Sequence, residues 1–242
     1  MKHQLYYFKD HMMLLTDTEP AESHKHLATH LIFSLEGETE WNIAGDKIKC
    51  RGIYIDANVE HVGKGGGSFI SFLFAKPSDF AYTLEKNFLK GKTHFIMDGK
   101  TLEKVAAAVK QYYGNPEKQD REILETCMMT HLEKRSYDSR IQTAISMIEN
   151  EETIDTGTIA KLSSRVCLSQ SRFSHLFKEE TEMPLAGYLA FEKLRKTYQY
   201  LMTGENITTC CIKAGFATPS HCAATCRKMF GLSLSKIESR GQ

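Results

Sequence analysis

Side chains suited to DNA binding gather in two short segments near the C-terminal end of the chain. The first segment holds side chains that can hydrogen-bond to base edges or pair with phosphates: Gln170, Ser171, Arg172, Ser174, His175 and Lys178. Between them, Phe173, Leu176 and Phe177 are spaced i, i+3, i+4, which predicts a helix that buries these three residues. The polar side chains would then share the exposed face, where a major groove can accept them.

The neighbouring residues predict the elements that hold this helix in place. A short amphipathic helix over 158–162 comes first, a turn follows at 166–168, and Ser169 stands where an N-cap is needed. The pattern recurs as a helix over 207–215, a turn over 216–219 and a helix over 220–230 that stops at Gly231. Two helix-turn-helix units in one domain indicate a protein that binds two stretches of duplex DNA.

Composition and charge are those of a globular protein with a basic end. The 242 residues are 41% apolar and 25% charged, no apolar run is long enough to span a membrane, and the N-terminal segment is too charged for a secretion signal. We therefore expect a cytoplasmic protein without membrane contact. The net charge of +1 divides into +5 for residues 153–242 and −4 for the rest, which fits DNA binding at one end. The seven cysteines include no C-x-x-C pair, and we expect no disulfide framework.

The N-terminal part predicts short strands followed by helices. Strand-like runs separated by Gly, Asn and Asp occupy 31–35, 40–43, 49–51, 53–55 and 69–74, which favours a small barrel or sandwich. Two helical faces follow, one of Leu102, Val105, Ala106 and Val109, the other of Ile123, Cys127, Met128 and Leu132. These helices can cover the barrel, pair with a second subunit, or do both. We favour pairing, in a homodimer, because helix-turn-helix proteins often act on repeated half-sites.

The C-terminal part resembles the DNA-binding domain of the AraC/XylS family of bacterial transcription regulators. The matching residues lie in both units and in the helix between them: Leu168, Ser169, 173–178, Tyr188, Leu189, Ile207, Gly215, Phe216, Ser220, Arg227, Lys228, Phe230 and Gly231. In that family the helix that corresponds to 188–202 is a rigid spacer. It would hold both recognition helices on one face of the DNA, about one helical turn apart.

Carried over position by position, the resemblance assigns DNA contacts to both recognition helices. The first would use the six residues from Gln170 to Lys178 named above. The second would use Pro219, Ser220, His221 and Ala224, with Arg227 and Lys228 nearby. Because only Ser220 and His221 of the second set are obvious hydrogen-bonding side chains, we expect the first unit to supply most of the base discrimination.

Several residues depart from the family pattern. Cys167 and Glu182 occupy turn positions that often hold glycine, and Leu234 replaces a usual proline. In the second unit, cysteine stands where the family pattern usually has Ile, Ala and two Phe: Cys210, Cys211, Cys222 and Cys226. These four could form a zinc or thiol-sensing cluster, but we favour core packing, because free cysteine behaves as a small buried hydrophobe. The second unit would then be less tightly packed than the first.

The N-terminal part is similar to the cupin-like sensor domain of many of these regulators, over 24–26, 31–37, 56–61 and 69–77. In relatives this barrel binds a small effector, and the adjoining helices form a dimer. The resemblance therefore implies an α+β fold. A cupin-like β-barrel with flanking helices would occupy 1–136, and an all-α domain with two helix-turn-helix units joined by a long helix would occupy 137–242.

Four histidines of the predicted barrel could form a metal site. His24, His26, His30 and His61 include an H-x-H pair and a distant partner, as metal-binding cupins have, and converging imidazoles can hold a divalent metal. The usual carboxylate ligand is missing from its expected place, so we predict no metal and no cofactor. We instead assign these histidines to an effector pocket, with Trp41 and Tyr54 on neighbouring strands.

The combined prediction is a DNA-binding transcription regulator rather than an enzyme. Its partners would be double-stranded promoter DNA, a small-molecule effector and RNA polymerase, and family habit favours activation. A cupin enzyme, such as an iron-dependent oxygenase, would explain the histidines but not the C-terminal part. A DNA-repair methyltransferase with a similar DNA module would need a reactive acceptor cysteine in a nucleophile motif, and the sequence shows none.

Overall fold

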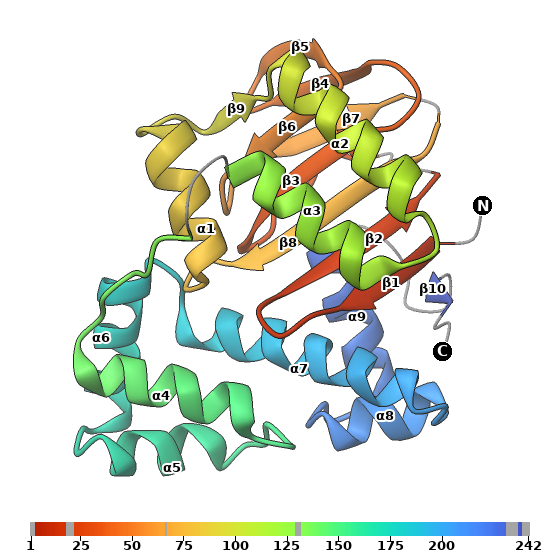
Figure 1. Ribbon diagram of the computed structural model, residues 1–242. Helices are drawn as coiled ribbons and strands as arrows, with labels where there is room; N and C mark the ends of the chain where they lie inside the picture. The colour runs from red at the N-terminus through yellow and green to blue at the C-terminus, as the bar shows by residue number, and fades with distance from the viewer. Residues whose placement is uncertain (1–2, 18–21, 66, 129–131, 231–236, 239–242) are drawn as a thin grey trace.

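The chain folds into a sheet-rich N-terminal part above a layer of helices (Figure 1). The computed structural model describes residues 3–17, 22–65, 67–128, 132–230 and 237–238. Within these residues, no helix is both long and apolar enough to cross a membrane.

Two sheets face each other in the N-terminal part. The larger has the strand order β10-β1-β2-β8-β3-β6-β9 and the smaller the order β5-β4-β7. Their bounds are β1 (His3–Tyr7), β2 (His11–Thr16), β3 (Ala28–Ser34), β4 (Thr39–Ile43), β5 (Asp46–Cys50), β6 (Gly52–Ile55), β7 (His61–Lys64), β8 (Phe69–Ala75), β9 (His94–Ile96) and β10 (Ile237–Glu238). The pairs are antiparallel except for β1 with β10. The five predicted strands are present, and β1, β2, β7, β9 and β10 are additions to the prediction.

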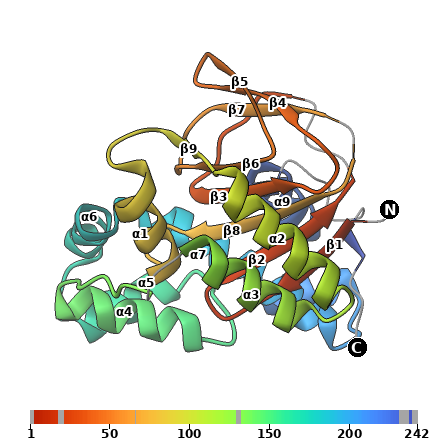
Figure 2. The ribbon, with the colours of Figure 1, turned by 45° about the horizontal axis from the view of Figure 1, so that its top comes forward.

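Both faces of the larger sheet are covered, which explains why β3 and β8 are buried at every position. One face packs against α1 (Asp79–Leu84), the π-helix η1 (Glu85–Leu89), α2 (Gly99–Tyr112) and α3 (Pro116–Met128). Figure 2 shows α2 and α3 side by side across this face. The smaller sheet covers only part of the other face, and β4 alternates buried and exposed residues accordingly.

The helices that we assigned to subunit pairing cover the sheet in this structure. Val105 and Ala108 of α2, with Ile123 and Leu124 of α3, are buried in one cluster with the sheet. The exposed faces of both helices carry mainly charged and polar residues. Leu132, which we placed on the face of the second helix, lies beyond the end of α3 and is 39% exposed. Pairing with a second subunit stays a prediction.

The C-terminal helices form the two predicted helix-turn-helix units. α4 (Ser139–Asn150) leads to the first unit, α5 (Thr158–Arg165) and α6 (Gln170–Thr181). The spacer α7 (Leu185–Met202) connects it to the second unit, α8 (Ile207–Lys213) and α9 (Pro219–Phe230). Ser169 caps α6, because its side chain accepts a hydrogen bond from the backbone N–H of Arg172 at 3.2 Å. Gly231 and Leu234 lie outside the described residues.

Cys167 and Glu182 adopt the left-handed conformation that the glycine-like positions require. Their φ angles are +55° and +58°, a region that costs a non-glycine residue about 1 kcal/mol. Glu182 offsets that cost with ion pairs to two residues of the preceding part of the chain. Its carboxylate lies 2.8 Å from Arg135 Nη2 and 3.8 Å from Lys76 Nζ.

The helical layer docks directly on the larger sheet. Its docking core is continuous and includes Leu5, Met12 and Leu73 of the sheet together with Tyr188 and Phe191 of α7. Within α7, the Arg195 guanidinium pairs with the buried Glu192 carboxylate at 2.7 Å and donates a hydrogen bond to the Tyr7 hydroxyl of β1. The two parts of the chain therefore share one apolar core, with an ion pair at its edge.

A second buried charge links β2 to α3. His11 is 2% exposed, and its Nδ1 and Nε2 atoms lie 2.8 Å from Asp10 Oδ1 and 2.7 Å from Asp120 Oδ1. Burial lowers the pKa of His11, but the hydrogen bonds and charges of Asp10 and Asp120 outweigh it and raise the pKa to about 9. Burial raises the pKa of Asp120, and the His11 charge opposes that shift. At neutral pH the raised pKa keeps His11 in its imidazolium form between the two carboxyl groups.

This arrangement makes stability depend on pH in the alkaline range. Because the pKa of His11 is raised on folding, its contribution is fully present below about pH 6.5 and is lost as the pH rises through about 9. A shift of this size corresponds to about 3 kcal/mol. We expect urea unfolding to show that loss between pH 6.5 and 9.5 in the wild type but not in the double variant His11→Gln/Asp120→Asn, which keeps a polar pair without charge. Equal losses in both proteins would contradict the assignment.

Candidate functional site

The first recognition helix presents its polar face as predicted. Of the six assigned residues, five are exposed and Ser174 is half-buried, while Phe173, Leu176 and Phe177 are buried beneath them. The Arg172 guanidinium lies 3.5 Å from Glu179 on the same helix, and both side chains are more than half exposed. A surface pair of this kind is weak, so Arg172 is free to exchange it for a base or phosphate contact.

The second recognition helix presents a smaller polar surface. Ser220, His221, Ala224, Arg227 and Lys228 are exposed, and Pro219 is half-buried. The His221 ring packs edge-on against Phe216 at a centroid distance of 5.4 Å, which fixes the imidazole near the turn. Gly215 must be glycine here, because its φ is +97° and a Cβ would lie 1.8 Å from the Ile154 carbonyl oxygen.

The spacer α7 connects the two recognition helices. Figure 1 shows α6 near the start of α7 and α8 with α9 near its other end. Most of α7 is buried, since it packs against both units and against β1. The two polar surfaces are therefore held at a fixed separation by a single helix.

The difference between the two polar surfaces leads to a ranking. We expect Arg172→Ala or His175→Ala to reduce discrimination among mutated DNA sites by about 1–3 kcal/mol at the contacted positions. His221→Ala should change it less. Lys178→Ala should instead weaken binding to all duplexes alike and lower the salt dependence by about one phosphate contact. Binding measured on a panel of single-base variants decides this, and equal or reversed losses for His221→Ala would contradict the ranking.

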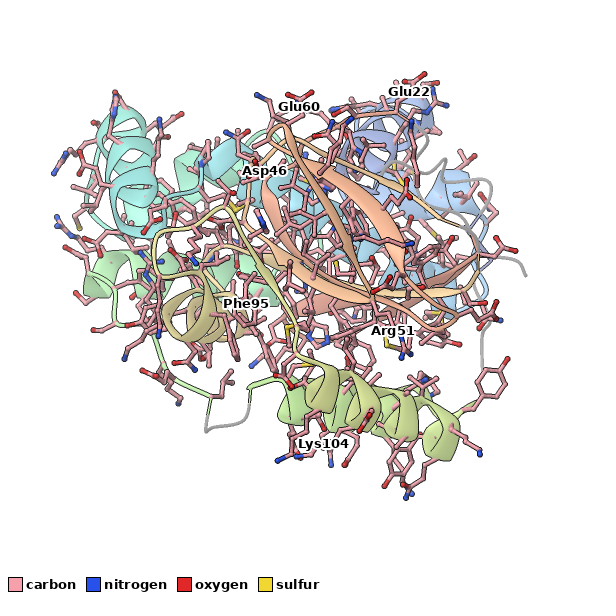
Figure 3. All side chains as sticks on the ribbon, turned by 90° about the horizontal axis from the view of Figure 1, so that it is seen from above. Glu22, Asp46, Arg51, Glu60, Phe95 and Lys104 are labelled. Atoms are coloured by element: carbon pink, nitrogen blue, oxygen red, sulfur yellow. The ribbon has the colours of Figure 1, made fainter. Side chains whose placement is uncertain are left out.

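The four histidines of the effector prediction lie together. The ring centroids of His24 and His61 are 4.5 Å apart, those of His26 and His61 are 5.1 Å apart, and those of His26 and His30 are 5.1 Å apart. His26, His30 and His61 are buried, and His24 is half-buried at the rim. Near that rim, Ser23 donates a hydrogen bond to the Glu60 carboxylate at 3.0 Å. Figure 3 labels Glu22 and Glu60 along this edge of the molecule.

The cluster is held neutral by its surroundings. Burial, with His61 and His24 nearby, lowers the pKa of His26 to about 3. Burial and neighbouring His24 likewise lower the pKa of His61 to about 4, and burial lowers the pKa of His30 well below its usual value. Sequence reasoning missed one member of this site: Ser71 of β8, whose hydroxyl lies 2.7 Å from His30 Nε2.

Trp41 and Tyr54 do not join the histidines. Trp41 is buried between the two sheets in an apolar cluster with Ile32, Ile53 and Phe69. Tyr54 lies on the opposite face of the larger sheet, where its hydroxyl donates to the Ala81 carbonyl at 3.4 Å. The reason is the two-residue period of β6, which turns Ile53 and Ile55 toward the smaller sheet and Tyr54 toward α1.

Cysteines of the second unit are core residues. Cys210, Cys211, Cys222 and Cys226 are each 0% exposed. The Cys226 thiol lies 3.2 Å from the Tyr198 hydroxyl, and burial raises its pKa to about 12. A thiol that stays protonated is a poor nucleophile and metal ligand, so the geometry favours packing over the zinc or sensing role.

Thiol labelling tests this assignment. Only Cys167 is exposed among the seven cysteines. We expect one thiol per chain to react rapidly with a thiol reagent in the native protein, all seven after denaturation, and none rapidly in the Cys167→Ser variant. Rapid native labelling of two or more thiols in that variant would show that the cluster is accessible.

Comparison with known proteins agrees with the C-terminal geometry. Residues 162–240 match the family model described as a helix-turn-helix domain. Among curated proteins, no sequence match is found. The fold is similar to that of ToxT from Vibrio cholerae: an apo form shares 9% identity over 94% of this chain and 96% of that chain, with a TM-score of 0.62.

Two further structures of ToxT show the same likeness. One shares 10% identity over 95% of this chain and 97% of that chain, with a TM-score of 0.59. Another, with an unsaturated fatty acid bound, shares 10% identity over 94% of each chain, with a TM-score of 0.54. The predicted AraC-type helix-turn-helix domain and the α+β architecture, sheet-rich first and helical second, are confirmed.

Proposed function

We propose that this chain, whose C-terminal residues form an AraC-type double helix-turn-helix domain, is a sequence-specific DNA-binding transcription regulator. The observation that carries the proposal is the pair of exposed polar faces on α6 and α9, connected by the buried α7. Such a pair fits two neighbouring major-groove segments of one duplex.

The N-terminal part would be the regulatory half of this protein. Its sheet shares a core with α7, so a ligand that changes the packing of the sheet also acts on the spacer between the recognition helices. Activation of transcription, contact with RNA polymerase, a homodimer and a cytoplasmic location belong to the same proposal. The two functions would belong to the two predicted domains, with effector sensing in residues 1–136 and DNA binding in residues 137–242.

The ligand of ToxT does not transfer directly to this chain. A ToxT structure holds an unsaturated fatty acid, and the facing residues of the two sheets of this chain form a buried apolar cluster. The described residues offer instead a buried polar site, the histidine cluster. The effector is therefore better sought among ligands of imidazole than among long-chain acids.

The regulator is favoured over the two enzymatic alternatives. A cupin enzyme would leave the match over 162–240 and the exposed recognition faces without a role. A repair methyltransferase needs an accessible nucleophilic cysteine, but six of the seven cysteines are buried and the exposed Cys167 lies in the turn before α6.

Selection from random DNA tests the proposal. Duplexes bound by the full chain should converge on a shared motif, and the selected site should bind roughly a thousandfold more tightly than scrambled competitor at moderate salt. The matched control is the Arg172→Ala/His175→Ala variant, which should lose the preference while it retains weak, salt-sensitive binding. No enrichment, with or without candidate effectors, would overturn the proposal.

A further inference from the structure

Three imidazole nitrogens converge at the histidine cluster. His24, His26 and His61 can each direct one ring nitrogen to a common point, and these atoms lie within 4.8 Å of one another. The supporting backbone is already paired: the His24 N–H donates to the His61 carbonyl at 3.0 Å, and the His61 N–H donates to the His24 carbonyl at 2.9 Å. The site therefore rests on two chain segments that are tied together beside it.

Hydrogen bonds fix which nitrogen of each ring is free. The Nδ1 atoms of His24, His26 and His61 lie 3.1, 2.9 and 2.9 Å from the carbonyl oxygens of Glu22, Ala28 and Val59. A carbonyl only accepts hydrogen bonds, so each Nδ1 carries the proton and each Nε2 carries a lone pair. None of these three buried Nε2 atoms has a hydrogen-bond partner within the described part of the chain.

Three converging lone pairs without donors are unusual in a protein interior, where polar atoms are almost always satisfied. His26 and His61 are only 4% and 2% exposed, so bulk water does not satisfy them. A bound cation satisfies all three atoms at once, and the carbonyl contacts of Nδ1 are those that orient histidine ligands in metal sites. In the sequence, the missing carboxylate ligand argued against a metal site. Its absence changes the charge of the donor set, but the three histidine nitrogens still converge.

We propose that His24, His26 and His61 bind a divalent transition-metal ion, and that this ion is the effector that controls DNA binding. The second part rests on the function proposed above. A donor set of neutral imidazoles suits zinc and neighbouring metals such as nickel, iron or copper, not magnesium or calcium. Three protein ligands leave one tetrahedral position open, toward which His30 or a solvent molecule can turn.

The position of the cluster explains how the ion acts on the DNA-binding helices. On β3, Ala28, His30 and Ile32 share one face by the two-residue period. Ala28 belongs to the core shared with α7, and Ile32 belongs to the core under the smaller sheet. The histidines thus lie where the smaller sheet meets the helical layer.

Leu27 provides the direct contact with the spacer. It follows His26 in the chain, and its Cδ1 lies 2.2 Å from where a Cβ on Gly187 of α7 would stand. A metal ion that ties His24 and His26 to His61 of β7 also restrains the segment that holds Leu27 against α7. The metal-bound and metal-free states then differ in how firmly α7 is held. A ligand can regulate DNA binding only if it favours one such state over the other.

Metal uptake tests the site itself. The full chain, stripped with a chelator, is titrated with Zn²⁺ and with Co²⁺. We expect one ion per chain, a Co²⁺ visible spectrum typical of tetrahedral nitrogen ligation, and at least about a hundredfold weaker binding in His26→Ala and in His61→Gln. His94→Ala, a histidine outside the cluster, is the matched control and should bind as the wild type does.

Three results overturn the site. One is less than a fifth of an ion per chain in the wild type, and another is equal affinity in the cluster variants and the control. The third is a thiolate-to-metal charge-transfer band with Co²⁺, which would place the ion on cysteine. The spectrum of the wild type decides the ligand type even where a variant fails to fold.

DNA affinity for the selected duplex, with and without Zn²⁺, tests the effector role. We expect at least about a fivefold change in the wild type and none in His26→Ala. The Leu27→Ala variant should bind the ion but lose the change in DNA affinity. The Leu35→Ala variant should keep that change, because Leu35 is a half-buried leucine that packs against the core between the larger sheet and α2 and α3. Metal binding without any change in DNA affinity overturns the effector role and leaves the site. If the protein binds no duplex specifically, with or without Zn²⁺, the proposed function fails. If it binds DNA specifically but takes up no metal, only this inference fails.

Discussion

The packing of α7 is the constraint on which the rest of the structure depends. This one helix contributes apolar side chains to a core that extends from the larger sheet into both helix-turn-helix units. Its polar residues are also committed, because Glu192 and Arg195 form a buried pair that reaches Tyr7 of β1. A charge buried in this way is costly unless it is paired, so these contacts favour the register of the helix on the sheet that joins the three residues.

That constraint determines the geometry of DNA binding. A helix of 18 residues spans about 27 Å, somewhat less than the roughly 34 Å of one turn of duplex DNA. The first unit is held a second time, through Glu182 in its left-handed turn and the cations Arg135 and Lys76. The second unit is followed instead by β10, which pairs with β1 of the larger sheet, and four cysteines are buried in its core. The two halves are thus unequal in both anchoring and surface chemistry.

Local signals predicted the helical half well. Ser169 as a cap, the i, i+3, i+4 stripe of Phe173, Leu176 and Phe177, and the turn at Gly215 are each set by residues close in sequence. The sheet was predicted less completely: β1 and β2 were missed, and β2 begins with His11, whose burial depends on Asp120 more than a hundred residues away. The face on which Tyr54 lies depends on which layer covers each side of the sheet, and no local pattern contains that information.

The candidate sites show the same division. Exposure of the assigned DNA-binding residues followed from periodicity, because a helix buries one face and leaves the other. The histidines were identified by spacing, but their free Nε2 atoms depend on carbonyl groups that only the folded backbone brings to Nδ1. The docking of the helices on the sheet, with Leu27 against Gly187, involves residues that no motif singles out.

The most direct test of the central claim, two recognition surfaces held apart by one buried helix, is a change of spacing within the DNA. Once a bound duplex is identified and footprinted, five base pairs are inserted between its two contacted segments, which turns the second segment to the opposite side of the helix. The account predicts that binding then falls to the level of the first segment alone, with protection lost over the second. Unchanged affinity and an unchanged footprint over both segments would contradict it.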